Sequence, residues 1–200
     1  MDVRELRIAH CVEFTPKVFP DDRGAFLEWF RQDELAAATG RRLDLKQANL
    51  SLSRRGVLRG IHFTDVPPGQ AKYVTAVAGA VLDFAVDLRV GSPTFGEWDV
   101  VRLDAETRRA VFLPEGIGHA FLALADGSTV SYLTTDSYHP ERERSLRPTD
   151  ARVALDLAGV DPADLVLSEK DAAAPTLDEL ADQGLLPTWE DCLATYREAA

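Results

Sequence analysis

Short β-prone segments separated by turn residues fill the chain from about residue 10 to residue 156, and no long helical pattern interrupts them. The clearest segment spans residues 81–88, where every second side chain is large and apolar: Leu82, Phe84, Val86 and Leu88. This period of two is typical of a strand with one buried face. Further β-rich segments lie at 72–78, 97–103, 110–113, 120–125 and 129–134. Several short strands at this spacing predict an antiparallel sandwich or barrel.

Helical patterns are short and gather near the C-terminus. Thr176 and Glu179 have the spacing of a capping box, and Gly184 follows as a helix stop. A second short helix is expected from Thr188 toward Tyr196, and a brief one at 32–38, before Gly40. We find no repeat and no linker. The chain therefore predicts one domain over 1–200, with a core at about 10–157 and a helical segment at about 158–200.

Composition and charge narrow the class of protein. The 200 residues are 46% hydrophobic and 28% charged, as in an ordinary globular protein. No apolar run approaches the roughly 18 to 20 residues that span a bilayer, and no secretory pattern opens the chain, so we expect a cytoplasmic protein. Cys11 and Cys192 are far apart, without metal-ligand spacing, and predict no disulfide. A net charge of −11 disfavours nucleic acid and membrane partners, while leaving room for one small anion.

Two of the four histidines, His62 and His119, each follow a glycine-rich turn. A single strand histidine is usually structural, but two such histidines in a small β domain favour a site. On a regular strand, His62 points away from Ile61 and Phe63, toward the face of Leu58 and of residue 64.

The pattern Pro-x-Gly-x-x-His at 114–119 resembles the second motif of the cupin superfamily. The first cupin motif normally holds a metal with His-x-His, and here Thr64 replaces the second histidine. A threonine is a poor ligand for such metals, so we expect no metal and no cofactor. The histidines are then expected to act in acid–base chemistry or hydrogen bonding.

Eight motifs in order along the chain resemble the dTDP-4-dehydrorhamnose 3,5-epimerase family: Phe19–Glu28, Gln47–Ser51, Leu58–His62, Ala71–Val74, Asp83–Arg89, Gly91–Gly96, Leu113–Phe121 and Leu167–Asp171. The resemblance covers about residues 10–187. It implies a mainly β fold, a cupin-type antiparallel β-sandwich (jelly roll) with short C-terminal helices. It also implies a homodimer that epimerises a dTDP-4-keto-6-deoxyhexose at C3, C5 or both.

The resemblance assigns four catalytic roles. Removing a proton next to a ketone requires a base, stabilisation of the enolate oxygen and an acid on the other face. His62 is the expected base, oriented by Asp171. Lys72 is expected to neutralise the enolate oxygen, and Tyr132 to return a proton from the opposite face. Each could instead be an ordinary packing or surface residue.

The family resemblance also implies a set of substrate-binding residues. Arg23 and Arg59 are expected to bind the two phosphates, because guanidinium groups fit phosphate oxygens. Arg59 lies on the opposite strand parity from His62, so both can face one cavity only if the strand bends, bulges or ends. The other expected residues are Glu28, Gln47, Asn49, His119, Tyr138, Glu143 and Lys170. The segment Phe19–Glu28 is expected to reach the pocket of a neighbouring subunit, and Asp83 could orient His119.

Three departures from the rhamnose-pathway pattern stand at Thr64, Ala120 and the segment 153–157. Together with the segment 67–72, they resemble the branch that serves deoxysugars of bacterial natural products. They leave open whether C3, C5 or both are inverted. The alternatives are a single-site epimerase, a keto-sugar isomerase on the same scaffold, a metal-dependent cupin oxygenase and a non-catalytic sugar-binding protein.

Overall fold

The computed structural model describes residues 1–199, and within them the chain is mainly β. The strands are β1 Asp2–Glu5, β2 Val12–Thr15, β3 Val18–Asp21, β4 Gly24–Leu27, β5 Gln47–Ser53, β6 Leu58–Thr64, β7 Lys72–Ala78, β8 Ala80–Asp87, β9 Trp98–Asp104, β10 Ala110–Leu113, β11 Ile117–Ala123, β12 Ser128–Thr134 and β13 Glu143–Ser145. The helices are α1 Gln32–Thr39, α2 Glu169–Ala172, α3 Leu177–Asp182 and α4 Trp189–Glu198, with a 3₁₀ turn at Pro162–Asp164.

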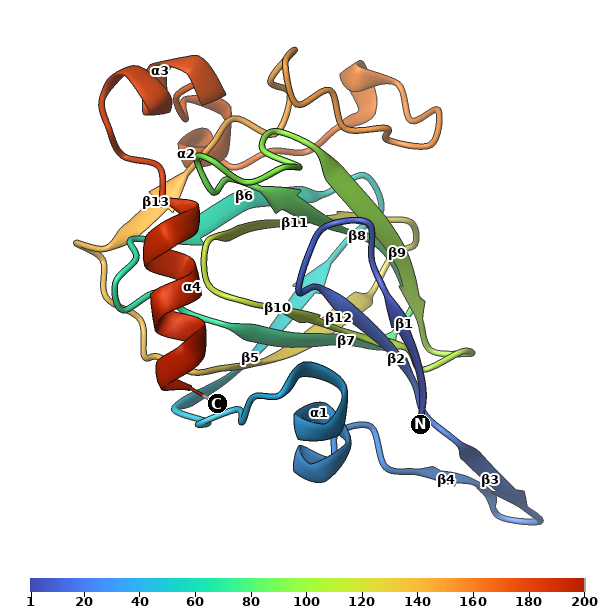
Figure 1. Cartoon of the computed structure of the whole chain (residues 1–200). Helices are drawn as coiled ribbons and strands as arrows, with labels where there is room; N and C mark the ends of the chain where they lie inside the picture. Colours follow the sequence, from blue (N-terminus) through green and yellow to red (C-terminus); the bar gives the residue numbers. More distant parts are fainter. Residues whose placement is uncertain (200) are drawn as a thin grey trace.

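Two antiparallel sheets face one another (Figure 1). The six-stranded sheet has the order β1-β2-β10-β7-β12-β5, and the five-stranded sheet has the order β13-β6-β11-β8-β9. This confirms the expected antiparallel sandwich. The strand expected at 120–125 begins earlier, at Ile117, because Gly116 turns the chain at φ 84° and Ile117 already pairs with Asp87.

Alternation along the strands divides the apolar residues among three clusters. The cluster between the sheets draws Val74 and Val130 from the six-stranded sheet, and Val81 and Phe121 from the five-stranded sheet. The outer face of the five-stranded sheet packs on the C-terminal segment, which includes α3. The outer face of the six-stranded sheet packs on α1. Side chains that share strand parity with the first cluster therefore point between the sheets.

The helices expected from the sequence, α1, α3 and α4, lie where it predicts them, whereas the four-residue helix α2 is not predicted. Thr176 and Glu179 form the capping box at the start of α3, and Gly40 ends α1 in the left-handed conformation. Thr188 caps α4, which runs past Tyr196 along one end of the sandwich (Figure 1). Ala200, the last residue of the expected helical segment, lies outside the described residues. None of the described helices is long and apolar enough to cross a membrane.

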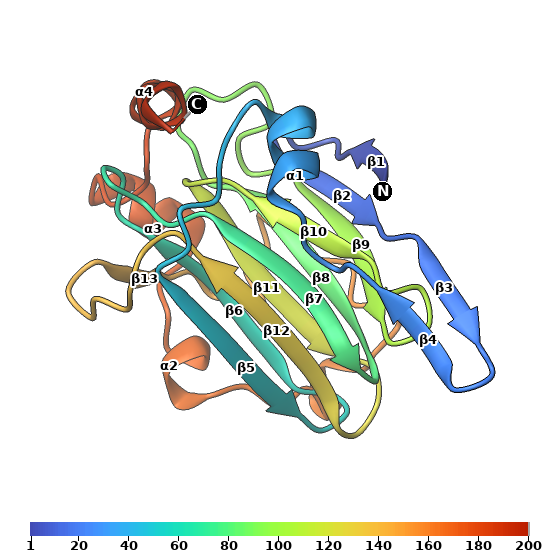
Figure 2. The same cartoon turned by 90° about the horizontal axis from the view of Figure 1, so that it is seen from below.

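Strands β3 and β4 form a separate two-stranded hairpin that projects from the sandwich (Figures 1 and 2). Two aromatic rings on it are open to solvent, Phe19 at 46% and Phe26 at 66% exposed. At its tip, Arg23 hydrogen-bonds only to Asp21 among the described residues. The hairpin therefore holds exposed apolar and basic groups far from the sandwich interior.

Candidate active site

Facing side chains from the two sheets line one hollow. Strand parity directs Lys72 on β7 and Tyr132 on β12 inward from the six-stranded sheet, because they alternate with outward-packed Tyr73 and Leu133. His62 on β6 and His119 on β11 point inward from the five-stranded sheet, and the two histidines are direct partners in the strand register. The structure thus brings a candidate base and a candidate acid to opposite walls.

The hollow consists of two adjoining cavities that share His62, Lys72 and Tyr132. The larger, of about 450 Å³, is also lined by Gln47, Asn49, Gln70, Tyr138, Glu143 and Lys170. The smaller, of about 180 Å³, is also lined by Ser51, Arg59, His119 and Phe121. Most of the expected site residues therefore meet in one place. Gln70, Ser51 and Phe121 are not among the expected site residues, although Ser51 and Phe121 end two of the quoted motifs and Gln70 lies within the segment 67–72.

His62 and Asp171 form a hydrogen-bonded pair, with His62 Nε2 at 2.7 Å from Asp171 Oδ1. The carboxylate is buried at 5% side-chain exposure, whereas the imidazole is 37% exposed to the cavity side. Burial favours a higher pKa for Asp171, but hydrogen bonds from His62 and from the Ser168 hydroxyl outweigh it and hold the pKa below its ordinary value. An ionised Asp171 accepts a hydrogen bond from the Nε2–H group of His62, which leaves Nδ1 free to take a proton.

A bulge in β6 lets Arg59 and His62 line the same hollow. Arg59 pairs with Phe121 and His62 with His119, so three steps along β6 match two along β11. This resolves the parity conflict seen in the sequence. The expected placement of Leu58 on the side of His62 is wrong for the same reason: Leu58 packs in the outer cluster with Ile61 and Phe63.

Gly60 at the bulge has φ 112°, and a Cβ there would lie 2.4 Å from the His119 carbonyl oxygen and 2.7 Å from Ala120 Cα. We expect Gly60→Ala to unfold at a clearly lower temperature and to lose most activity, since strain of about 1–3 kcal/mol adds to the overlap. The matched control is Gly127→Ala, which shares a positive φ of 71° but has no atom within 4 Å. Equal melting temperatures and activities for the two variants would contradict a structural requirement for the bulge.

Lys72 is a buried cation without a close anion. Among the described residues, no carboxylate lies within 4 Å of its ammonium group. Burial lowers the pKa of Lys72, and the carboxylates of Glu143 and Asp83 oppose that shift. Such a group is positioned to stabilise negative charge that develops on a bound molecule.

Tyr132 keeps its proton more strongly than an ordinary tyrosine. Burial raises its pKa, the Glu143 carboxylate adds to the rise, and Arg59 opposes it. Its ring lies edge-on to that of His119, with centroids 6.5 Å apart. A protonated phenol on the wall opposite His62 has the arrangement required of an acid.

Two of the expected binding residues are not brought to the hollow. Arg23 lies at the tip of the projecting hairpin with its side chain 89% exposed. Glu28 lies just beyond the hairpin and pairs with Arg31 at 3.4 Å. Arg59, in contrast, lines the smaller cavity and donates to the Ser53 hydroxyl at 3.2 Å and the Leu52 carbonyl at 3.1 Å.

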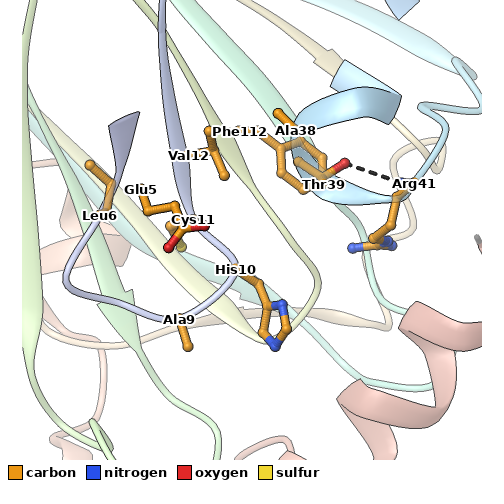
Figure 3. Close-up of a pocket in the computed structure, with 10 residues that line it drawn as sticks. All are labelled: Glu5, Leu6, Ala9, His10, Cys11, Val12, Ala38, Thr39, Arg41 and Phe112. Carbon is orange, nitrogen blue, oxygen red and sulfur yellow. Dashed lines mark hydrogen bonds between the residues drawn. The ribbon is translucent and has the colours of Figure 1, made fainter. Parts of the chain in front are cut away.

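A separate cavity of about 300 Å³ lies between the β1–β2 turn, the end of α1 and β10 (Figure 3). None of the expected site residues lines it. Its charged wall is structural, since Arg41 pairs with Glu115 at 2.7 Å and stacks on the ring of Tyr196. The ring of His10 also packs against Tyr196 in α4. This region fastens the C-terminal helix to the sandwich.

The residues present do not fit the metal centre of the wider cupin fold. Thr64 takes the place of a histidine ligand, and its buried hydroxyl has no partner among residues 1–199. Over the same residues, no three His, Cys, Asp or Glu side chains converge as a metal site would require. The two cysteines are free and buried.

Residues 5–179 match the family model described as dTDP-4-dehydrorhamnose 3,5-epimerase. The chain belongs to this family. A dTDP-4-dehydrorhamnose 3,5-epimerase of Mycolicibacterium smegmatis is 53% identical over 194 residues, which cover 97% of this chain and 94% of that protein.

Two solved structures link the chain to the natural-product branch of the epimerase family. NovW, a 4-keto-6-deoxy sugar epimerase from the novobiocin biosynthetic gene cluster of Streptomyces spheroides, is 52% identical, with a TM-score of 0.92 over 96% of this chain and 95% of that one. ChmJ, a 3'-monoepimerase from Streptomyces bikiniensis in complex with dTDP-quinovose, is 43% identical, with a TM-score of 0.92 over 97% of each chain. Family membership and the resemblance to this branch are confirmed.

Proposed function

We propose that this protein epimerises a dTDP-4-keto-6-deoxyhexose by removing a proton next to the C4 ketone and returning one from the opposite face. The observation that carries the proposal is the placement of His62 and Tyr132 on facing sheets around one hollow. The names of the similar proteins, which include 3,5-epimerases and a 3'-monoepimerase, support the same chemistry.

In the proposed reaction, His62 takes the proton from C3 or C5 and becomes an imidazolium that Asp171 stabilises. The electron pair of the broken C–H bond moves into the enolate, whose oxygen accepts hydrogen bonds from the Lys72 ammonium group. Tyr132 then gives its phenolic proton to the same carbon from the other wall. Solvent removes the proton from His62 and restores the one on Tyr132. The ketone is regenerated, and only the configuration of the carbon has changed.

The same hollow explains how an acidic chain could bind a nucleotide sugar. Arg59 supplies a guanidinium at the smaller cavity, and Lys170 an ammonium group at the larger one. Two phosphate charges suit such groups. Gln47, Asn49 and Tyr138 line the larger cavity, where amide and aromatic groups could receive a base. We propose that the protein acts as a single functional domain in the cytoplasm. We propose that it binds neither nucleic acid nor a membrane.

Product analysis by NMR tests the function against its nearest rival. After incubation with dTDP-4-keto-6-deoxyglucose, we expect a carbonyl still at C4 with inverted C3, C5 or both. A single-site epimerase would invert one centre, which is the alternative within the proposal. A carbonyl moved to C3 would make the protein an isomerase, and unchanged substrate would contradict epimerisation of this sugar.

We propose a homodimer in which the β3–β4 hairpin reaches the partner's hollow. The exposed Phe19 and Phe26, and the distance of Arg23 from its own cavity residues, support this arrangement. Arg23→Ala should lower kcat/KM by about 10- to 100-fold, as expected for one lost hydrogen bond to a charged group.

Complementation tests the exchange directly. His62→Asn inactivates the site of its own chain, whereas Arg23→Ala impairs the site of its partner. Co-refolding equal amounts should therefore restore about a quarter of wild-type activity, since half of the dimers are mixed and each has one intact site. A fully active monomer in light scattering, or no restored activity in the mixture, would contradict the exchange.

Chelation tests the expectation that no metal takes part. Enzyme dialysed against EDTA should retain its full rate, because Thr64 leaves the cupin ligand set incomplete. Activity that is lost to the chelator and restored by one added divalent ion would revive the oxygenase-like alternative.

A further inference from the structure

Asp83, in β8, is a buried carboxylate that the proposed reaction does not use. It is 2% exposed and lies on the face of β8 that points between the sheets. One oxygen, Oδ2, lies 2.8 Å from Nε2 of His119, and the other, Oδ1, is buried with no hydrogen-bond partner among residues 1–199. Burying a carboxylate without full pairing is costly, so its presence here calls for a compensating role.

His119 connects Asp83 to the hollow. Its ring lines the smaller cavity, lies opposite His62 in the strand register and meets the edge of the Tyr132 ring. A carboxylate can only accept a hydrogen bond, so Nε2 carries the proton that points to Asp83. Nδ1 makes no hydrogen bond within the described residues and remains available to a ligand. Asp83 thus fixes both the orientation and the tautomer of a ring in the cavity wall.

Lys72, on the facing sheet, lines the same smaller cavity as the His119 ring that Asp83 holds. Burial lowers the pKa of Lys72, while Glu143 on β13 and Asp83 on β8 are the two carboxylates that raise it. The other titratable groups around the hollow are His62 and Arg59 on β6, His119 on β11, Tyr132 on β12, Tyr138, and Lys170 and Asp171 on α2. Asp83 is hydrogen-bonded to the His119 ring, which lines the same smaller cavity as Lys72. Replacing Asp83 by an uncharged side chain therefore removes a negative charge from the wall of that cavity.

We infer that Asp83 is a positioning residue of the epimerase site, which holds the His119 ring against the cavity and adds negative charge to the wall of the cavity that Lys72 also lines. The inference rests on the proposed function, in which Lys72 stabilises the enolate oxygen. It assigns no proton transfer to Asp83 itself.

Asp83→Asn tests the inference, because the amide keeps the shape and an acceptor for His119 but removes the charge. We expect kcat to fall at least about 10-fold, short of the roughly 10⁴-fold cost of losing the carboxylate behind a histidine base, with KM nearly unchanged. The alkaline limb of the pH–rate profile should move to lower pH, since Lys72 loses its proton more easily. Glu97→Gln removes the same charge from an exposed site and should change neither quantity. A wild-type kcat and an unmoved alkaline limb for Asp83→Asn would overturn the inference.

A measurement on the wild-type protein keeps the inference testable if Asp83→Asn does not fold. In ¹⁵N–¹H NMR of the imidazoles at neutral pH, His119 should carry its proton on Nε2. A His119 with an unprotonated Nε2 would overturn the inference, whatever sugar the enzyme uses. Failure of the wild-type enzyme to convert dTDP-4-keto-6-deoxyglucose would instead count against the proposed function, because it leaves the tautomer of His119 untouched.

Discussion

His62→Asn is expected to abolish solvent exchange at every carbon that the wild-type enzyme inverts. Asparagine keeps a polar side chain at this position, but it is shorter than histidine, ending at about the level of Nδ1, and it cannot take a proton near neutral pH. A general base commonly accounts for about 10²–10⁴-fold in rate. Among the described residues that line the hollow, His119 is the other histidine on this wall that pairs with a carboxylate. Deuterium uptake measured by NMR in labelled water gives the rate for each carbon separately.

Binding provides the control for this variant. The phosphate and base contacts proposed for Arg59, Gln47 and Asn49 do not involve His62, so dTDP should bind His62→Asn nearly as tightly as it binds the wild-type protein. Calorimetry with dTDP checks this. Exchange at close to the wild-type rate would mean that another residue, with His119 the first candidate, removes the proton.

Tyr132→Phe should separate proton removal from inversion. Phenylalanine preserves the ring that packs against the core between the sheets and against His119, but it deletes the transferable proton. His62 can still form the enolate and Lys72 can still stabilise it, so the carbon should exchange with deuterium. The proton returns only from the side it left, and inversion should fall by about 10²–10⁴-fold.

The two rates for Tyr132→Phe are measured in one sample, exchange by loss of the proton signal and inversion by the product's coupling constants. Normal inversion would mean that the proton comes from water or from another residue, with Tyr138 in the larger cavity as the next candidate. Joint loss of exchange and inversion would give Tyr132 a role in packing or substrate positioning, and the two-wall mechanism would lose its main support.

The sequence predicts the architecture well where a short local pattern, such as an alternating strand or a helix cap, determines the secondary structure. The alternation at 82–88, the capping box at Thr176 and the stop at Gly40 are local signals, and each reappears at its predicted place. The sequence places the start of β11 too late, because the residues just before His119 form a glycine-rich turn with no strand pattern. Their strand conformation depends on pairing with β8, which lies about thirty residues earlier in the chain.

The site depends on contacts that local patterns cannot specify. The bulge at Gly60 changes which residues of β6 face inward, so parity alone misplaces Leu58 and separates Arg59 from His62. Gln70 enters the hollow from a loop with no periodic signal. For Arg23 and Glu28, the family resemblance and the structure of the single chain differ. The family resemblance assigns them to a binding site, but within one chain they lie on or beside the projecting hairpin.

The most direct test of two-wall proton transfer is the deuterium content of the wild-type product. Incubation with dTDP-4-keto-6-deoxyglucose in deuterated water should give one solvent deuterium at each inverted carbon, because the base on one wall discards the original proton and the acid on the other supplies a new one. Label at C3 alone, C5 alone or both also identifies which centres the enzyme inverts. Inverted sugar that retains its original hydrogen would contradict the mechanism.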